Sequence, residues 1–256
     1  MITLPTQKVK AETSNSKYLV YFGKPKVGKS CIASQLEDNL IIDLKDEYAH
    51  LTAFKVKANN LTELGEVINL IKKKNQECNG FAYKHITLDN ATWLMEMISP
   101  LAAKKYRAMP FGKSWTGTNV LELPKGAGYY YLKEAFQEII DIFRSLTPHF
   151  ILICHVKDNA IDKDGEEINE LSIDLFSSLA RLISAEADSI AYVYRDKNKT
   201  IMDFNGIGNV IAQSRQEHLR GKKIVIAESD ENNKVTTYWD RIYLPELTQT
   251  QLNQAA

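Results

Sequence analysis

The apolar residues of the chain form short continuous runs that alternate with stretches of helical periodicity. Four such runs stand at 17–22 (KYLVYF), 39–43 (NLIID), 85–89 (HITLD) and 150–154 (FILIC). Short, unbroken apolar runs are typical of parallel strands that are buried on both faces of a sheet. The pattern therefore predicts an α/β fold with a mostly parallel central sheet, flanked by helices.

The helical stretches lie between and after these runs. Residues 61–71 and 132–143 carry apolar side chains three and four positions apart, so each stretch predicts an amphipathic helix. Asn59 or Asn60 stands where the first of these helices needs an N-cap. A further helix is expected near 175–186.

Three more strand candidates follow in the last third of the chain, at 189–194 (SIAYVY), 200–204 (TIMDF) and 223–228 (KIVIAE). They are short and close together, so we expect antiparallel strands that extend the parallel sheet. The segment 107–128 contains glycine, proline and aromatic residues and is predicted to be a loop region.

Composition bounds the class of protein. The 256 residues are 44% hydrophobic and 25% charged, which is ordinary for a globular domain. Because 32 basic residues balance 32 acidic ones, any nucleic-acid site must be local. No apolar run approaches the length of a membrane span, no secretory signal is evident, and the three cysteines have no paired spacing. We therefore expect a cytoplasmic protein without membrane contact.

The segment after the first strand reads GKPKVGKS and matches the phosphate-binding pattern G-x-x-x-x-G-K-[ST]. In such a loop the backbone N–H groups surround phosphates, Lys29 reaches the β and γ oxygens, and Ser30 is a ligand of Mg²⁺. The predicted cofactors are ATP and Mg²⁺. The predicted ATP-binding residues are Gly23, Lys24, Pro25, Lys26, Val27, Gly28, Lys29, Ser30 and Cys31.

Polar residues at the ends of other buried strands supply the rest of a hydrolytic site. Asp89 ends a strand and is the candidate carboxylate for the Mg²⁺ water shell, with helix capping as the alternative. Asp43, Asp46 and Glu47 follow the second strand and compete for the role of general base, of which Glu47 is preferred. His155 follows the fourth strand and would face the γ-phosphate, unless it is only a polar cap.

Two other patterns are set aside. Cys154 and His155 are adjacent in a strand and point to opposite faces, so they cannot act as nucleophile and base. The run at 160–171 resembles a calcium loop, but Ala160 and Leu171 occupy ligand positions. It is better interpreted as a hairpin turn at 162–165.

These motifs together resemble the RecA-like P-loop ATPases encoded by bacteriophages, a group that includes phage nucleotide-binding proteins and single-strand annealing ATPases. The resemblance covers about 17–228. Its most specific parts are YFGKPKVGKS, HITLDN and ILICHVKD, and it is joined by IID, PKGAGYYYLKEAF, ADSIAYVYR and SRQEHLRGKKIVIAE. It implies a RecA-like ATPase core, a homo-oligomer, and work on single-stranded DNA with other replication or recombination proteins.

The resemblance also implies roles for single residues. A catalytic glutamate, a strand-terminal aspartate and a γ-phosphate sensor fall near Glu47, on Asp89 and on His155. Lys45 stands where a RecA-type alignment would place the glutamate, so either Asp46 or Glu47 remains the base. Ser214 and Arg215 match a recurrent Ser-Arg pair. The arginine is then expected to reach a neighbouring subunit's phosphate, with a surface salt bridge as the alternative.

Residues 98–131 are basic and aromatic, as a single-strand binding segment would be. The candidate DNA-binding residues are Lys104, Lys105, Arg107, Lys113 and Trp115, with possible help from Arg215, Arg220, Lys222 and Lys223. The aromatic residues could equally pack the loop against the sheet. The acidic segment 157–174 would repel DNA.

The expected organisation is an N-terminal arm at 1–16, a RecA-like ATPase core at 17–228, and a C-terminal extension and tail at 229–256. Two other functions remain open from the sequence. One is a P-loop module that uses ATP as a switch for a protein partner. The other is a small-molecule kinase, which the lack of an evident arginine-rich lid disfavours.

Overall fold

The architecture was obtained as a computed structural model of the chain. It describes residues 4, 6–8, 15–163, 166–206 and 210–245, with the backbone alone for 158–163 and 166–169.

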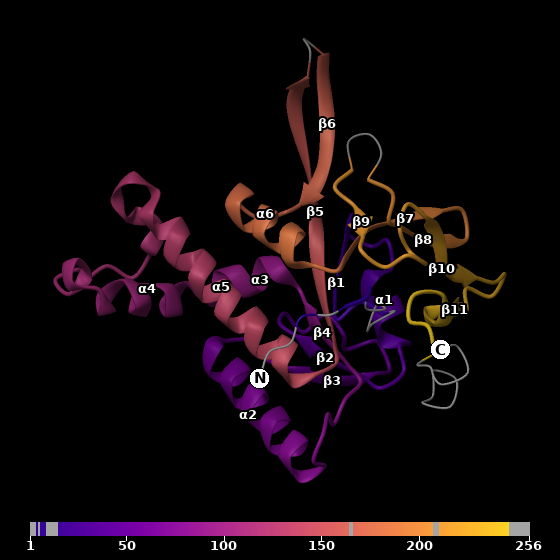
Figure 1. Cartoon of the computed structure of the whole chain (residues 1–256), viewed down its shortest axis with the longest axis horizontal. Helices are drawn as coiled ribbons and strands as arrows, with labels where there is room; N and C mark the ends of the chain where they lie inside the picture. Colours follow the sequence, from indigo (N-terminus) through magenta and orange to yellow (C-terminus); the bar gives the residue numbers. More distant parts are fainter. Residues whose placement is uncertain (1–3, 5, 9–14, 164–165, 207–209, 246–256) are drawn as a thin grey trace.

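The centre of the protein is a sheet with the strand order β11-β10-β8-β7-β1-β5-β4-β2-β3 (Figure 1). All neighbours from β7 to β3 pair in parallel, whereas β7–β8, β8–β10 and β10–β11 are antiparallel pairs. The strands on this path are β1 (Tyr18–Gly23), β2 (Asn39–Asp43), β3 (Phe54–Lys57), β4 (His85–Asp89), β5 (His149–Lys163), β7 (Ser189–Asp196), β8 (Lys199–Asp203), β10 (Lys223–Ser229) and β11 (Val235–Thr237). The predicted parallel sheet with an antiparallel extension is therefore confirmed.

Strand order also fixes where the polar strand ends meet. β5 lies between β1, which leads into the phosphate-binding loop, and β4, which ends in Asp89. Because β1, β5, β4 and β2 are parallel neighbours, their carboxyl ends share one edge of the sheet. The sequence motifs at these ends are thus brought to one place.

Four of the described strands escaped the sequence pattern, and two of them are very short: β11, and β9 (Gln213–Ser214), which pairs antiparallel with β7. β3 is the edge strand, and three of its four residues are exposed, so it has no apolar run. β6 (Glu166–Ile173) is a polar strand that pairs antiparallel with β5, from Val156 opposite Ile173 to Lys163 opposite Glu166. The hairpin predicted around 162–165 is confirmed by these flanking strands, while Asp164 and Gly165 lie outside the described residues.

Helices cover both faces of the sheet. They are α1 (Lys29–Ser34), α2 (Leu61–Glu77), α3 (Ala91–Met97), α4 (Ser99–Ala108), α5 (Ala127–Leu146) and α6 (Ser177–Glu186), with short 3-10 helices η1 (Pro110–Gly112), η2 (Val120–Glu122), η3 (Pro124–Gly126) and η4 (Trp239–Arg241). Asn60 caps α2 by accepting the N–H of Glu63 at 3.0 Å, while the Glu63 carboxylate accepts the N–H of Asn59. This reciprocal pair decides between the two predicted caps.

The six residues of β1 are all buried, and they alternate between two separate cores. Tyr18, Val20 and Phe22 pack with apolar residues of α2 to α6, whereas Leu19 and Tyr21 pack with α1 and the C-terminal segment. A strand buried on both faces needs apolar residues at every position, because successive side chains point to opposite faces. This explains why KYLVYF has no polar alternation.

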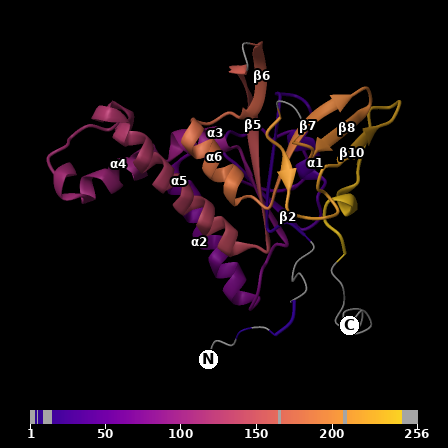
Figure 2. The same cartoon turned by 45° about the horizontal axis from the view of Figure 1, so that its top comes forward.

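Two parts extend away from the sheet. The β5–β6 hairpin projects beyond the edge at which β1 and β4 end (Figures 1 and 2). On another side, α4, η1 to η3 and the start of α5 form a lobe, here called the α4–α5 lobe and defined as residues 99–131 (Figure 2). The loop predicted at 107–128 belongs to this lobe.

The segment 229–245 belongs to the same packed structure as the rest of the described chain. β11 adds to the sheet, and Trp239, Ile242 and Tyr243 are buried in the core that contains α1. The Trp239 indole N–H donates to the carbonyl of Ile32 in α1 at 2.8 Å. At the other end, the Asn15 side chain bonds the backbone of Leu244. Within the described part of the chain, no helix combines the length and apolarity that a membrane crossing requires.

Candidate nucleotide-binding site

The backbone of the loop between β1 and α1 requires glycine at Gly23 and Gly28, the two glycines of the phosphate-binding pattern. Gly28 adopts a left-handed conformation (φ 101°) directly before α1. At Gly23 a Cβ atom would lie 2.3 Å from the carbonyl oxygen of Val193, which leaves no room for a side chain. The loop therefore passes close to β7 and turns sharply into the helix, as a phosphate-binding loop must.

The other loop residues are accessible to a ligand. The loop residues Lys24, Pro25 and Lys26 are exposed. Val27 is partly buried against the core that contains α1, and Cys31 lies half-buried in α1 itself. The loop thus offers an open backbone surface above the start of α1.

Lys29 folds back into this loop. Its ammonium group donates to the carbonyl oxygens of Gly23 at 2.8 Å and Lys24 at 2.9 Å. Burial lowers the pKa of Lys29, and the nearby Asp89 carboxylate opposes that effect. The side chain is thus a buried cation held by neutral acceptors inside the loop, where a phosphate can compete for it.

The carboxylate of Asp89 meets the loop at the start of α1. Its Oδ2 accepts the hydroxyl of Ser30 at 2.9 Å and the phenol of Tyr48 at 2.7 Å. Burial raises the pKa of Asp89 to about 6, and these two donors limit the rise. The two predicted Mg²⁺ residues are therefore in direct contact. Tyr48 escaped the sequence prediction because its only signal is an aromatic residue beside the acidic turn.

The acidic turn after β2 is organised by Asp43. This buried carboxylate accepts the N–H groups of Lys45 at 3.2 Å, Glu47 at 3.0 Å and Tyr48 at 3.0 Å. The hydrogen bonds that the structure shows for the Asp43 carboxylate all come from backbone N–H groups of this turn. Asp43 therefore shapes the loop that carries Asp46 and Glu47.

Asp46 and Glu47 point to different surroundings. Asp46 forms an ion pair with Lys57 at 2.5 Å, on the outer strand β3. Glu47 is exposed, and its charge raises the pKa of both Lys29 and Asp89. Of the two alternatives, Glu47 is the carboxylate whose field reaches the nucleotide site.

His155 lies within β5, opposite Gly23 in the register, and not after the end of a strand as predicted. The prediction was wrong on this point because β5 continues as a polar ribbon into the β5–β6 hairpin. The His155 Nε2 lies 3.2 Å from the side-chain nitrogen of Asn90, and the buried Nδ1 has no hydrogen-bond partner among the residues that the structure describes. Burial, followed by the charge of Lys29, lowers the pKa of His155. A neutral imidazole thus stands between the loop and β4.

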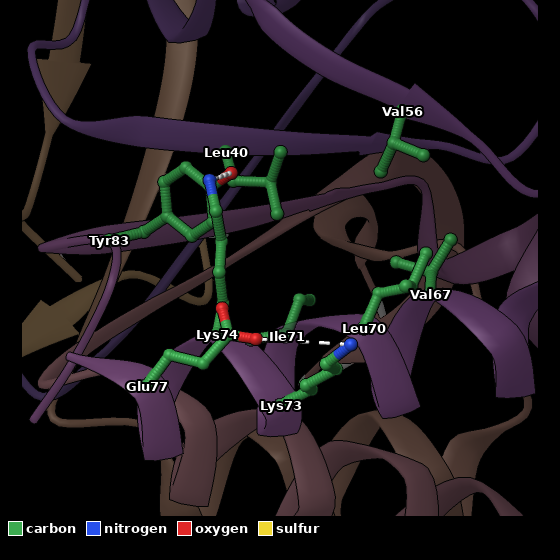
Figure 3. Close-up of a pocket in the computed structure, with 9 residues that line it drawn as sticks. All are labelled: Leu40, Val56, Val67, Leu70, Ile71, Lys73, Lys74, Glu77 and Tyr83. Atoms are coloured by element: carbon green, nitrogen blue, oxygen red, sulfur yellow. Dashed lines mark hydrogen bonds and ion pairs between the residues drawn. The ribbon is translucent and has the colours of Figure 1, made fainter. Parts of the chain in front are cut away.

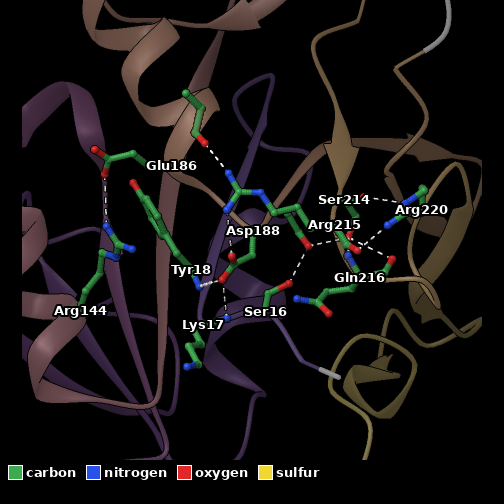
Figure 4. Close-up of polar contacts among 12 residues, drawn as sticks. Ser16, Lys17, Tyr18, Arg144, Glu186, Asp188, Ser214, Arg215, Gln216 and Arg220 are labelled. Carbon is green, nitrogen blue, oxygen red and sulfur yellow. Dashed lines mark hydrogen bonds and ion pairs between the residues drawn. The ribbon is translucent and has the colours of Figure 1, made fainter. Parts of the chain in front are cut away.

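Arg215 lies away from this site in its own chain. Its guanidinium donates to the Ala185 carbonyl at 2.6 Å and pairs with Asp188 at 3.4 Å (Figure 4). Asp188 in turn accepts the N–H of Tyr18, at the amino end of β1. Ser214 is buried and bonds the hydroxyl of Ser189. The pair therefore occupies the opposite edge of the sheet from the phosphate-binding loop, and the Arg215 side chain remains 61% exposed.

Three of the five candidate DNA-binding residues are engaged within the α4–α5 lobe. Lys105 pairs with Glu138 at 2.5 Å, and Arg107 donates to the Gly117 carbonyl and lies over the Trp115 ring. Trp115 contacts Tyr106 edge-on, with ring centroids 5.2 Å apart. These contacts favour the packing alternative for Trp115. Lys104 and Lys113 are exposed.

A separate apolar groove of about 380 Å³ lies between α2 and the strands β2 and β3 (Figure 3). Its lining residues are Leu40, Val56, Val67, Leu70, Ile71, Lys73, Lys74, Glu77 and Tyr83. None of them belongs to the loop or to the carboxylate cluster, so this groove is not the nucleotide site.

The donor set fits a magnesium nucleotide. Ser30 and Asp89 are oxygen donors in contact, as Mg²⁺ prefers, and the described residues contain no group of three His, Cys, Asp or Glu that could hold a metal alone. A site with so few protein ligands suits an ion that takes its remaining oxygens from water and phosphate. The fold and this site define a P-loop nucleotide-binding protein of the ATPase type.

Sequence comparison agrees with that class. The family model described as AAA domain matches residues 14–225, and the chain belongs to this family. No curated protein matches the chain.

Proposed function

We propose that the protein is a Mg²⁺-dependent, RecA-like ATPase of bacteriophage type that works as a homo-oligomer on single-stranded DNA. The observation that carries the proposal is the meeting of Lys29, Ser30 and Asp89 beside Glu47 and His155, at the carboxyl ends of four parallel strands. A site that only binds a nucleotide has no need of the acid Glu47 or the neutral His155 at this edge, whereas a site that hydrolyses ATP can use both.

Each residue has a role that follows from its position. The loop N–H groups and Lys29 bind the phosphates, and Lys29 exchanges its carbonyl acceptors for phosphate oxygens. Ser30 and Asp89 would hold Mg²⁺, which neutralises phosphate charge when bound. Glu47 takes a proton from the attacking water as general base. The Asn90 side-chain amide donates to Nε2 of His155, so Nδ1, which has no hydrogen-bond partner among the described residues, carries the ring hydrogen and would donate it toward the γ-phosphate.

Several features support the wider proposal. The motifs at 17–228 resemble the phage RecA-like group, and Arg215 is exposed at the edge opposite the loop, where a neighbouring subunit could be reached. On the α4–α5 lobe, Phe111 is 66% exposed and Tyr129 and Tyr130 are about half exposed, and the lobe also carries the exposed Lys104 and Lys113. The Lys133 ammonium group lies over the Tyr130 ring. Exposed rings next to cations suit stacking of bases and contact with phosphates.

The test is the ATPase rate of the wild type and of Lys29→Ala, with and without single-stranded DNA, on protein whose mass in solution is measured with and without ATP. We expect DNA-stimulated turnover by an oligomer, and a loss on the order of 100-fold or more in Lys29→Ala. The matched control is Lys72→Ala on the exposed face of α2, which should retain the wild-type rate.

The same experiment separates the other functions. ATP binding without turnover would support a nucleotide-dependent switch for a protein partner. Phosphate transferred to a small acceptor would support a kinase. A fully active Lys29→Ala protein would exclude the proposed site.

A further inference from the structure

Tyr48 is a buried phenol that touches the metal-binding carboxylate and has no role in the functions assigned above. Its ring is fully buried in the core beneath α1, and its hydroxyl donates to Asp89 Oδ2 at 2.7 Å. Burial raises the pKa of Tyr48 well above its usual value, so the phenol keeps its hydrogen, and an ionised carboxylate can only accept it.

The backbone of Tyr48 is held as firmly as its ring. Its N–H donates to Asp43 Oδ2 at 3.0 Å, and its carbonyl accepts from the N–H of Leu51 and from the Lys55 ammonium group. Asp43 and Asp89 face each other at the ends of β2 and β4. Tyr48 is therefore fixed to one strand end and bonded through its hydroxyl to the other.

The direction of the two bonds to Asp89 leaves one oxygen for the metal. Among the described residues, the donors to this carboxylate are Ser30 and Tyr48, and both bond Oδ2. With Oδ2 occupied, Oδ1 is the oxygen that can face the water shell of Mg²⁺. Groups that hold a metal ligand in this way often matter nearly as much as the ligand itself.

We propose that Tyr48 is a positioning residue, which orients Asp89 for Mg²⁺ and joins this carboxylate to the turn that carries Glu47. The inference rests on the proposed function, since it requires a Mg²⁺ nucleotide at the loop. Glu47 precedes Tyr48 directly, and both backbone N–H groups donate to Asp43, so the turn with the base and the metal carboxylate belong to one hydrogen-bonded network.

The test uses Tyr48→Phe, which keeps the buried ring and removes the hydroxyl. The readout is ATP affinity, measured by calorimetry in Mg²⁺ and in EDTA. We expect the gain in affinity that Mg²⁺ provides to fall roughly 10-fold or more, while affinity in EDTA stays within about 2-fold. The matched control is Tyr18→Phe, because the Tyr18 hydroxyl is also buried but has no hydrogen-bond partner within the described ranges of the chain. It should bind as the wild type does.

A double-variant cycle excludes a merely structural effect. In an Asp89→Asn background, Tyr48→Phe should change the Mg²⁺-dependent affinity no further, since the hydroxyl acts through that carboxylate. Equal losses in both backgrounds, or no loss in either, would overturn the inference. Thermal unfolding of each variant shows whether it is folded. If wild-type affinity itself does not depend on Mg²⁺, the proposed function fails instead.

Discussion

At the scale of single residues, a second buried polar cluster lies at the opposite end of the parallel strands. His85 and His149 stack with ring centroids 5.3 Å apart, and Tyr243 packs against both. The Nδ1 of His85 bonds the Glu37 carbonyl, whereas its buried Nε2 has no hydrogen-bond partner in the described part of the chain. Burial lowers the pKa of His85 to about 4, and His149 and Lys84 add to this effect.

This pKa predicts a loss of stability in acid. The unfolded chain binds a proton at His85 near pH 6.5, but the folded protein binds it only near pH 4. Stability present above pH 6.5 is therefore lost as the pH falls through this window, by up to about 3 kcal/mol for this group. In His85→Phe, which keeps the stacked ring, the free energy of unfolding measured with denaturant should fall correspondingly less between pH 6.5 and 4.5.

The control for that measurement is the exposed His50. His50→Gln should follow the wild-type pH dependence. An identical acid loss in wild type and His85→Phe would show that the buried histidine does not destabilise the protein in acid.

Site residues could be predicted from the sequence where they belong to one short motif, but not where their contacts join residues that are far apart along the chain. Lys29 and Ser30 belong to one local motif, and Asp89 ends an unmistakable strand, so these positions could be predicted. The hydroxyl of Tyr48 reaches Asp89 across 41 positions of sequence, and Asn90 reaches His155 across 65. No local pattern encodes such contacts, because they depend on which strands become neighbours.

At the scale of elements, the α4–α5 lobe is where the structure changes the expected DNA contacts. Lys105, Arg107 and Trp115 are engaged inside the lobe, whereas Phe111, Lys104 and Lys113 remain accessible. If the lobe binds single strands, the accessible residues should carry the affinity.

The double variant Lys104→Glu/Lys113→Glu should therefore weaken single-strand binding and reduce the slope of its salt dependence by about 1.4, because two phosphate contacts are lost. Phe111→Ala should weaken binding by about 1–3 kcal/mol with little change in slope, because it removes a stacking ring. Fluorescence anisotropy with a labelled oligonucleotide at several salt concentrations measures both quantities.

The charge control is Lys72→Glu/Lys73→Glu on α2, which makes the same change of net charge on a distant helix. Equal effects of the two double variants would point to net charge alone. Unchanged binding in the lobe variants would remove the lobe from the DNA hypothesis.

Element types were predictable wherever a strand or helix has an apolar pattern. β2 and β4 have the predicted bounds, since both strands are buried on two faces. β3 and β6 were missed because an edge strand and a projecting ribbon have few core contacts, so no apolar pattern marks them.

At the scale of the whole molecule, Arg215 and the phosphate-binding loop lie at opposite edges of one sheet. An arginine so placed cannot serve the site of its own chain. If it acts in hydrolysis, it must act in a head-to-tail assembly, in which one subunit's Arg215 edge faces the next subunit's loop.

Mixing two inactive variants tests this arrangement. Lys29→Ala lacks a working loop but retains Arg215, and Arg215→Ala has the reverse defect. In an equal mixture, about a quarter of head-to-tail interfaces combine an intact loop with an intact arginine, so ATPase activity should reappear. If the mixture shows no ATPase activity and Arg215→Ala unfolds at a lower temperature, the role of Arg215 is limited to its ion pair with Asp188. The baseline is the ATPase activity of each variant alone, measured at the same total protein concentration as the mixture.

The bond from Trp239 to Ile32 spans 207 positions of sequence, and this gives the nucleotide site a place in the order of synthesis. Synthesis runs from the phosphate-binding loop toward the C-terminus, so the indole that packs beneath the helix of the loop is made 207 positions after its partner Ile32. A nascent chain therefore carries the complete motif long before it has the support that shapes it. We expect nucleotide binding to begin only once Trp239 has been made and can pack against α1.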